Sequence, residues 1–281
     1  MVNTQEAPVW LVTGCSTGFG RSIAAHLLDE GFRVVVTARK TEQVEELAAR
    51  DNAFAAPLDV TSQDSVTEAV RRAEEHFGRI DVVVNNAGIG YFAAVEETAP
   101  ETVDRLFDVN FHGTARVIHA VLPGMRARRS GTIVNLTSIG GLVGHPAVGY
   151  YCAAKFAVEG LSESLRHEVM PLGITVMTVE PSAFRTDWAG SAQETQEPIA
   201  DYDATAGAAR RAYHDSVGKQ AGDPDRAARA LLTAVTAPEP PHHLLLGADA
   251  YDLATAQLKA RAREFEAWER VTRSADFPAG E

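Results

Sequence analysis

Short apolar segments alternate with longer amphipathic segments along most of the chain. The apolar segments lie at 8–14, 33–38, 53–58, 80–88, 131–138 and 174–181, and most of them are rich in Val, Ile and Thr. The segments between them have helical spacing and lie at 19–30, 42–50, 62–77, 101–129 and about 150–170. This alternation is typical of a parallel sheet covered by helices on both faces. A further apolar run at 243–247 predicts a seventh strand.

The predicted elements form one doubly wound, Rossmann-type α/β domain that spans residues 1–281. No Gly/Ser linker, internal repeat or low-complexity block interrupts the series. Residues 183–222 are the exception, because they have little strand character and a helical pattern only around Ala208–Ser216. An excursion of this length predicts a substrate lid. Residues 249–273 predict a long C-terminal helical extension.

The composition argues against several classes of partner. Hydrophobic residues make up 45% of the 281 positions, which is enough for a sizeable core. The formal net charge of −12 has the wrong sign for a protein that coats nucleic acid or an anionic membrane. The first ten residues lack signal-peptide organisation, and no apolar run approaches the eighteen or so residues of a membrane span. We therefore expect a cytoplasmic protein without nucleic-acid or membrane partners.

A glycine-rich turn follows the first predicted strand. Gly14, Gly18 and Gly20 stand in a G-x-x-x-G-x-G pattern that opens a helix. Glycines let the backbone approach a pyrophosphate, and the helix N-terminus supplies free N–H groups and the positive end of a dipole. A tight strand-to-helix turn is the alternative for such a loop in isolation. Its position at the start of an alternating chain favours dinucleotide binding.

Three motifs in this order resemble the short-chain dehydrogenase/reductase family. They are TGCSTGFG at 13–20, NNAG at 85–88 and the pair Tyr151-x-x-x-Lys155. The glycine spacing fits the single-domain branch of the family, since the extended branch usually carries G-x-x-G-x-x-G. The resemblance covers roughly residues 8–250. It implies an oxidoreductase that acts on C=O or CH–OH groups and assembles as a homo-oligomer, either a dimer or a tetramer.

The end of the second predicted strand favours NADP(H) as the cofactor. NAD enzymes normally end this strand with an acid that binds the ribose hydroxyl, whereas NADP enzymes offer a cation to the 2′-phosphate. Here Ala38 stands at the place of the acid, with Arg39 and Lys40 after it. Arg39 can donate two N–H bonds to a phosphate, and we expect no nearby carboxylate to repel that phosphate. Two solvated turn residues are the alternative.

The resemblance implies further cofactor contacts. Asp59 and Val60 would flank the adenine, and Asn86 with Gly88 would lie beside the cofactor ribose. The complete predicted cofactor set is Gly14, Ser16, Thr17, Gly18, Phe19, Gly20, Arg39, Asp59, Val60, Asn86, Gly88, Tyr151, Lys155, Pro181, Phe184 and Thr186.

Tyr151 and Lys155 are the predicted reacting pair. Ketone reduction needs a hydride donor and an acid that protonates the developing alkoxide. Residues four apart share a helix face, so the Lys155 ammonium can approach Tyr151, whereas Tyr150 is turned about a hundred degrees away. A charge about 4 Å away contributes on the order of 4 kcal/mol at an effective dielectric near 20, roughly three pKa units. We therefore expect Lys155 to lower the pKa of Tyr151 towards neutrality, with Tyr151 as general acid/base.

Two other residues complete the predicted catalytic set. Ser138 ends the fifth predicted strand, and because parallel sheets bind ligands at the carboxyl ends of their strands, its hydroxyl can polarise the substrate carbonyl. A turn-forming role is the alternative for Ser138, and Thr137 is its alternative in register. By resemblance, Asn110 holds a water for proton relay from Lys155, which also binds the ribose.

The segment after the sixth predicted strand departs from the family pattern. Many members have Pro-Gly here, whereas this chain has Pro181-Ser182, and Thr186 then matches a threonine that contacts the nicotinamide amide. If the glycine uses a positive φ, serine is strained there; otherwise its hydroxyl contacts the cofactor or the substrate. Both interpretations stay open.

Apolar residues around the predicted site favour a hydrophobic substrate. Trp188, Tyr202 and Tyr213 of the lid, with the stretch 142–145, would line a largely apolar cleft in which His145 is a polar wall. No metal is predicted, because strand alternation points the adjacent histidines 242 and 243 to opposite faces.

The favoured function is an NADP(H)-dependent oxidoreductase for a hydrophobic ketone, aldehyde or secondary alcohol, with reduction favoured by the cofactor. An NAD-linked secondary-alcohol dehydrogenase is the alternative enzyme. A non-catalytic dinucleotide-binding regulator is the alternative of another class, and the four filled catalytic positions argue against it. Cys15 lies in the cofactor loop and Cys152 follows Tyr151, so we also expect thiol modification to inhibit the enzyme.

Overall fold

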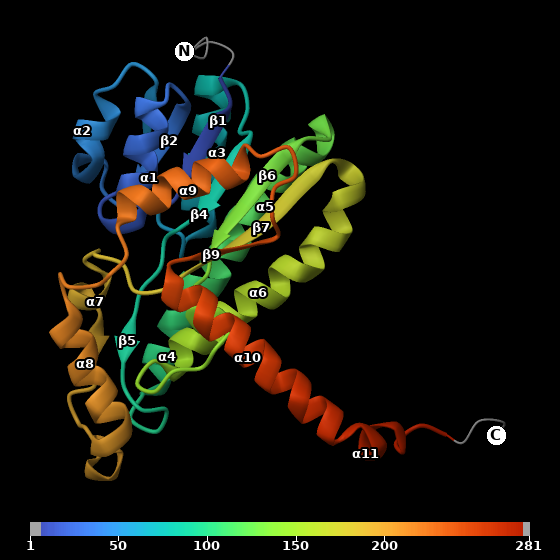
Figure 1. Cartoon of the computed structure of the whole chain (residues 1–281). Coiled ribbons are helices and arrows are strands. Elements are labelled where there is room, and N and C mark those ends of the chain that lie inside the picture. Colours follow the sequence, from blue (N-terminus) through green and yellow to red (C-terminus); the bar gives the residue numbers. More distant parts are fainter. Residues whose placement is uncertain (1–6, 278–281) are drawn as a thin grey trace.

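Seven parallel strands form the central sheet. They are β1 (Val9–Val12), β2 (Arg33–Ala38), β3 (Ala53–Pro57), β4 (Val82–Asn85), β6 (Gly131–Leu136), β7 (Ile174–Pro181) and β9 (His243–Leu246). In the computed structural model, which describes residues 7–277, they pair in the order β3-β2-β1-β4-β6-β7-β9 (Figure 1). The predicted seven-stranded, doubly wound fold is therefore confirmed. The order reverses between β1 and β4, where such sheets bind ligands beyond the carboxyl ends of their strands.

Helices cover both faces of this sheet because its strands are apolar on both sides. One face packs on α1 (Gly18–Asp29) and α9 (Pro224–Val235), and the other packs on α3 (Gln63–Phe77), α5 (Gly113–Arg128) and α6 (Gly149–Val169). Successive side chains of a strand alternate between these faces, so Trp10 and Val12 join the first core whereas Val9 and Leu11 join the second. The buried strands fix the position of every loop at their carboxyl ends.

Helix α9 was not among the predicted helices. Its N-cap residue, Asp223, accepts hydrogen bonds from the backbone N–H groups of Asp225 and Arg226, and Pro224 occupies the first turn. Asp followed by Pro is a recognised helix start, so the sequence contained this signal.

The predicted helix over 101–129 is divided in the structure. It consists of α4 (Pro100–Phe107), a π-helical turn at Asp108–His112 and α5. The side-chain amide of Asn110 donates to the Ile89 carbonyl and accepts from the Ile89 N–H. This pair of bonds holds the side chain towards the sheet, and the extra residue of the π turn accommodates it.

Residues 183–222 form a cover over one end of the sheet. They include α7 (Trp188–Ser191), β8 (Gln193–Glu194) and α8 (Ala208–Ser216), and β8 pairs with β5 (Tyr91–Phe92). Helix α8 confirms the helical pattern predicted around 208–216. Short helical turns complete the segment at Ala200–Tyr202 and Asp203–Gly207. We call residues 183–222 the lid.

The predicted C-terminal helix is present as α10 (Ala248–Ala267) and α11 (Glu269–Arg273). Figure 1 shows α10 leaving the body of the molecule after its first turns. Ala250 and Ala254 are buried, whereas Leu258, Phe265 and Trp268 are exposed. The helix is therefore anchored only at its start. The remaining short helices are α2 (Glu45–Ala48) and turns at Thr41–Val44, Ile139–Gly141 and Met170–Leu172.

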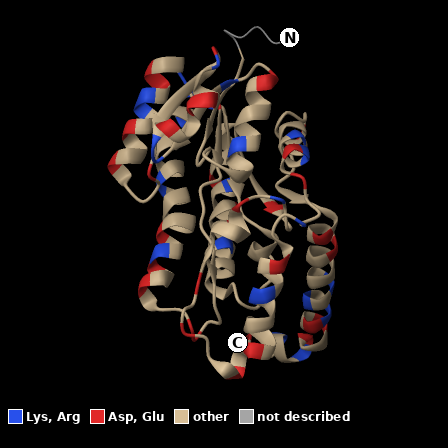
Figure 2. Cartoon of the chain, turned by 90° about the vertical axis from the view of Figure 1, so that its left-hand side faces the viewer, with Lys and Arg blue, Asp and Glu red and all other residues tan. Residues whose placement is uncertain are grey.

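Charged residues of both signs are interspersed along the described helices (Figure 2). Within residues 7–277, no helix combines the length and the apolar character that a membrane crossing requires. The expectation about a signal segment concerns mainly residues 1–6, which lie outside the described range.

Candidate active site

The glycine loop lies at the carboxyl end of β1 and leads into α1. Gly14 and Gly18 have φ angles of +73° and +57°, a region that favours glycine. The N-cap residue Thr17 makes no side-chain capping bond, so the first N–H groups of α1 remain available to a ligand. Together these features fit the phosphates of a dinucleotide.

Asn86 joins the ends of β1 and β4, and Gly20 of α1 packs closely against this contact. A Cβ on Gly20 would overlap the carbonyl oxygen of Gly14 and the amide nitrogen of Asn86. The Asn86 amide donates to the carbonyls of Thr13 and Gly14, at 2.8 and 3.1 Å. Asn86 was expected to lie beside the cofactor ribose, but these bonds make its side chain a brace between the two strands.

Gly88 leaves space beside the predicted catalytic lysine. A Cβ on Gly88 would lie 2.8 Å from Oδ1 of Asn110 and 3.7 Å from Nζ of Lys155. Because Gly88 has no side chain, the space beside the Lys155 ammonium stays open. The nicotinamide half of a dinucleotide fits this arrangement.

Arg39 is exposed at the carboxyl end of β2, where it can reach a ribose phosphate. The expectation that no carboxylate lies nearby is wrong, because Asp59 follows the adjacent strand β3 and Arg39 contributes to the lowering of its pKa. The largest cause of that lowering is the hydrogen bond from the Thr61 hydroxyl. Asp59 is thus already held by Thr61. Its neighbour Val60 is buried against Gly113.

Ser138 and Tyr151 lie on two sides of Gly140. A Cβ on Gly140 would lie 3.4 Å from the Ser138 hydroxyl oxygen and 3.5 Å from the Tyr151 ring. Ser138 accepts a hydrogen bond from the Gly140 N–H at 3.0 Å, which fixes its side chain. The hydroxyl of Thr137 instead contacts Glu159 and the Val179 carbonyl. The geometry therefore places Ser138, and not Thr137, beside Tyr151.

Lys155 lies on the same face of α6 as Tyr151 but does not lower its pKa in this structure. Burial raises the pKa of Tyr151, against a smaller opposite effect of Ser138. The Lys155 ammonium lies 5.7 Å from the centroid of the Tyr151 ring and donates to the Leu136 carbonyl at 2.8 Å. Burial lowers the pKa of Lys155 itself to about 8. The expected lowering of the Tyr151 pKa is therefore corrected for this structure, in which burial is the largest influence and raises it.

Aromatic side chains of the lid partly cover Tyr151. Trp188 packs on Tyr151 and on Phe92, with ring centroids 5.0 and 5.7 Å away, and Tyr213 stacks on Phe92 at 4.9 Å. These contacts support an apolar surface over the reacting centre. The expectation for residues 142 and 143 is wrong, because both pack with α10 instead of lining the cleft.

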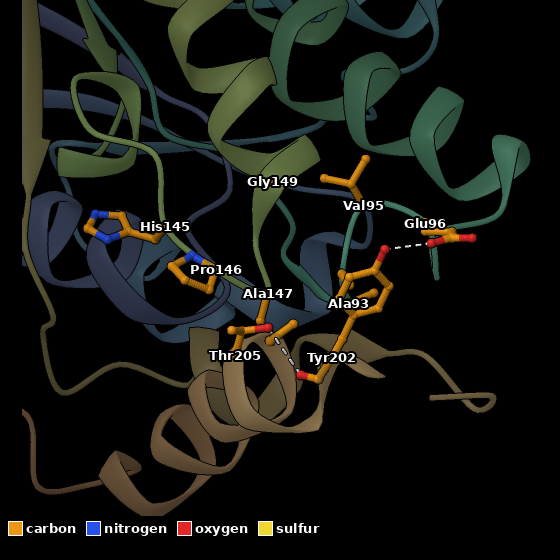
Figure 3. A pocket seen from close by; sticks show the side chains of 11 residues that line it. Ala93, Val95, Glu96, His145, Pro146, Ala147, Gly149, Tyr202 and Thr205 are labelled. Carbon is orange, nitrogen blue, oxygen red and sulfur yellow. Dashed lines mark hydrogen bonds between the residues drawn. The ribbon is translucent and has the colours of Figure 1, made fainter. Parts of the chain in front are cut away.

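A cavity of about 240 Å³ opens next to the start of α6 (Figure 3). Small apolar groups from 93–95, 146–147 and 149 form most of its wall, and Glu96 adds a carboxylate. The lid contributes Tyr202, Thr205 and Ala206. His145 also contributes to the wall, as predicted, and burial lowers its pKa, so the imidazole is neutral near pH 7. The cavity can take an apolar group.

The segment after β7 resolves one open question. Among residues 7–277, only Arg129 and Ala147 are non-glycine residues with positive φ, so Ser182 is not strained. Its side chain faces Gly247, and its N–H donates to the Leu246 carbonyl at 2.9 Å. Phe184 packs on Phe19 with centroids 5.0 Å apart. Thr186 lies opposite Gly18, at the mouth of the glycine loop.

The sequence matches the family profile described as short chain dehydrogenase over residues 8–197. The chain belongs to this family. Oxidoreductase BOA17 of Botryotinia fuckeliana is 38% identical over 94% of this chain and 97% of its own. Human 17-beta-hydroxysteroid dehydrogenase type 1 is 35% identical over 83% of this chain and 75% of its own. The protein is thus an oxidoreductase of the short-chain dehydrogenase family.

Solved structures agree with this assignment. A short-chain dehydrogenase from Streptomyces avermitilis is 41% identical, with a TM-score of 0.91 over 98% of this chain and 100% of that one. An alcohol dehydrogenase from Thermococcus sibiricus, solved with 5-hydroxy-NADP, is 28% identical, with a TM-score of 0.72 over 86% of this chain and 96% of that one.

The two cysteines of this short-chain dehydrogenase are buried. Burial raises the pKa of Cys15 to about 12 and also raises the pKa of Cys152. The thiolate is the reactive form, so we now expect iodoacetamide at pH 7.5 to leave both thiols and the activity intact for hours. Mass spectrometry of the treated protein checks this, with guanidinium-unfolded protein as the control that labels at both positions. Rapid inactivation that a Cys15→Ala, Cys152→Ala variant escapes would contradict it.

The sequence analysis missed one group near the site. Glu159, Glu180 and His243 meet between α6 and the sheet, although they come from three separate elements. The available signal was an acid at position 180 within the otherwise uncharged strand segment 174–181.

Proposed function

We propose that this short-chain dehydrogenase transfers hydride between NADP(H) and a hydrophobic ketone, aldehyde or secondary alcohol, and that the whole chain acts as one domain. The observation that supports this most is the placement of Ser138 and Tyr151 around Gly140, with Lys155 next to Tyr151 and Gly88. Two hydroxyl groups, of Ser138 and Tyr151, and the ammonium of Lys155 are the groups that reduction of a carbonyl requires beside a bound nicotinamide.

In the proposed reaction, Ser138 donates a hydrogen bond to the substrate oxygen. Tyr151 gives its proton to that oxygen as negative charge develops, and it takes the proton back during alcohol oxidation. Burial raises the pKa of Tyr151 in this structure, so the phenol holds its proton near pH 7 and is available as the acid. A bound nicotinamide supplies or accepts the hydride.

Lys155 and Asn110 support this centre. Lys155 would bind the ribose through its ammonium, which is predominantly protonated below its pKa of about 8. Asn110 holds the loop after β4 through its two bonds to Ile89 and thereby shapes the space beside Lys155. The relay of protons through a water at Asn110 is part of the proposal.

The walls of the site support a hydrophobic substrate class. Trp188 and Phe92 are aromatic, and the cavity beside α6 is mostly apolar. A ketone on a hydrophobic skeleton fits these surfaces better than a charged keto acid. The human relative, whose name describes a hydroxysteroid dehydrogenase, is compatible with this class.

The cofactor assignment is tested with Arg39→Ala. We expect the wild type to prefer NADPH over NADH in a screen of steroids, aromatic ketones, quinones and short keto esters. A charge-assisted hydrogen bond contributes about 1.5–3 kcal/mol, so the variant should lose roughly 10- to 100-fold in kcat/KM with NADPH and little with NADH. Arg71→Ala, at an exposed arginine of α3, is the matched control. A wild-type preference for NADH would favour the alternative NAD-linked alcohol dehydrogenase.

A further inference from the structure

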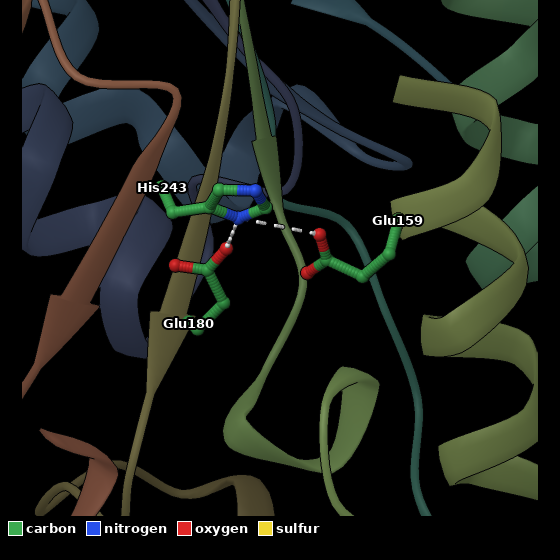
Figure 4. A group of neighbouring side chains, drawn as sticks. All are labelled: Glu159, Glu180 and His243. Atoms are coloured by element: carbon green, nitrogen blue, oxygen red, sulfur yellow. Dashed lines mark hydrogen bonds and ion pairs between the residues drawn. The ribbon is translucent and has the colours of Figure 1, made fainter. Parts of the chain in front are cut away.

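Three titratable side chains meet on the face of the sheet that α6 covers. Glu159 comes from α6, Glu180 from β7 and His243 from the start of β9 (Figure 4). Nδ1 of His243 lies 2.8 Å from Oε1 of Glu180 and 3.9 Å from Oε2 of Glu159. The Glu180 side chain is fully buried, and the Glu159 side chain is only 10% exposed. Burying ionisable groups costs free energy of folding, so a buried cluster of three suggests a role in function.

The single imidazole cannot neutralise both carboxylates. The hydrogen bond with Glu180 raises the pKa of His243, which makes it the cation of the pair. Burial, followed by the charge of Glu180, raises the pKa of Glu159 to about 7. Glu159 therefore changes its charge within the physiological pH range.

Glu159 also contacts the strand end that carries the catalytic serine. Consecutive residues at the end of β6 contact α6 one after another. The Leu136 carbonyl accepts from Lys155, and the Thr137 hydroxyl donates to Glu159. Ser138 follows, beside Tyr151. A shift of Thr137 would move Ser138 relative to Tyr151, because the two residues share a peptide bond.

Glu159 and Lys155 are electrostatically coupled. They lie one turn apart on α6, and the charge of Glu159 acts to raise the pKa of Lys155 against the effect of burial. The other charged groups near the cluster are Glu163, Arg166 and His242, and they interact with one another. Arg166 forms an ion pair with Glu163 at 2.7 Å and contacts His242 at 3.3 Å.

We propose that Glu159 is a positioning residue for the reaction, which fixes Ser138 through Thr137 and sustains the positive charge of Lys155. His243 and Glu180 hold its carboxylate in place. This inference rests on the proposed function of the site. It assigns two separable effects to one carboxylate, one through a hydrogen bond and one through its charge.

The charge effect is tested with Glu159→Gln, which keeps an oxygen acceptor for Thr137 but removes the charge. The dissociation constant of NADPH is measured by nucleotide fluorescence from pH 6 to 9.5. In the wild type, affinity should fall as Lys155 loses its proton near pH 8. In the variant, this fall should move to lower pH by about one unit. Glu163→Gln, one turn further along α6, should leave the profile unchanged.

The positioning effect is tested with Thr137→Val, which removes the hydroxyl and keeps the shape of the side chain. We expect kcat to fall about tenfold and Thr137→Ser to restore it. The pH midpoint of NADPH binding should shift less than in Glu159→Gln, because the carboxylate of Glu159 remains. The melting temperature of each variant shows whether the substitution has destabilised the fold as a whole. Thr137→Ser and Glu159→Gln are conservative changes, so we expect them to keep the fold.

The outcomes separate this inference from the proposed function. An unshifted NADPH profile in Glu159→Gln, or an undiminished kcat in Thr137→Val, would overturn it. If the wild type reduces no carbonyl compound, the proposed function fails, and the pH profile of NADPH binding still decides the charge effect of Glu159. If NADPH does not bind, the same titration with NADH decides it.

Discussion

Replacement of Tyr151 by Phe should reduce kcat by between about 10²- and 10⁴-fold, the usual contribution of a positioned general acid. The phenol oxygen is the group that would exchange a proton with the substrate, and Phe removes it alone. The ring contacts with Trp188 remain, so we expect the fold and the dissociation constant of NADPH to change little. Steady-state kinetics and a nucleotide fluorescence titration on the same preparation measure both quantities.

Tyr150→Phe is the matched control for this experiment. It makes the same chemical change one residue earlier in α6, on a side chain turned about a hundred degrees away. We expect its kcat to stay near that of the wild type. A Tyr151→Phe enzyme with near-normal turnover would contradict the proposed mechanism, and equal losses in both variants would indicate damage to the helix instead.

Replacement of Gly20 by Ala should destabilise the protein and impair cofactor binding together. The new methyl group would overlap the backbone carbonyl of Gly14 and the amide of Asn86, which is already held by two hydrogen bonds. Overpacking of this kind costs about 1–3 kcal/mol. At roughly 2–4 °C per kcal/mol, the melting temperature should fall by several degrees. NADPH affinity should fall at least tenfold, because the glycine loop must move.

Gly160→Ala provides the control in a helix interior. A Cβ on Gly160 meets no atom within 4 Å, so alanine should stabilise α6 by up to about 1 kcal/mol. Thermal melts of the two variants therefore shift in opposite directions. An unchanged melting temperature and NADPH affinity in Gly20→Ala would show that the β1 and β4 loops can separate at little cost.

The fold was largely predictable because its signals are local. Apolar strands that alternate with amphipathic helices predicted the seven-stranded sheet, and the helical spacing of Tyr151 and Lys155 placed both on one face of α6. The π turn at Asn110 was not predictable in the same way. It depends on Ile89, which reaches Asn110 only when the loop after β4 folds back.

The predictions about the site that were wrong concern residues whose neighbours are distant in the sequence. The pKa of Tyr151 depends on Trp188 of the lid, 37 positions further along the chain. Asp59 reaches Arg39 because β2 and β3 are neighbours in the sheet. Asn86 is a brace because β1 and β4 are adjacent at the reversal of strand order.

By itself the sequence determined the class of this protein and its sheet, and it pointed to the glycine loop and to the residues proposed for the reacting centre. These follow from periodicity and from short motifs, which are properties of neighbouring positions in the chain. The tertiary structure alone decided the electrostatics around these residues, including the packing of Trp188 from the lid on Tyr151 and the meeting of Glu159, Glu180 and His243. Burial and charge depend on which distant segments pack together, and packing is decided only when the chain folds.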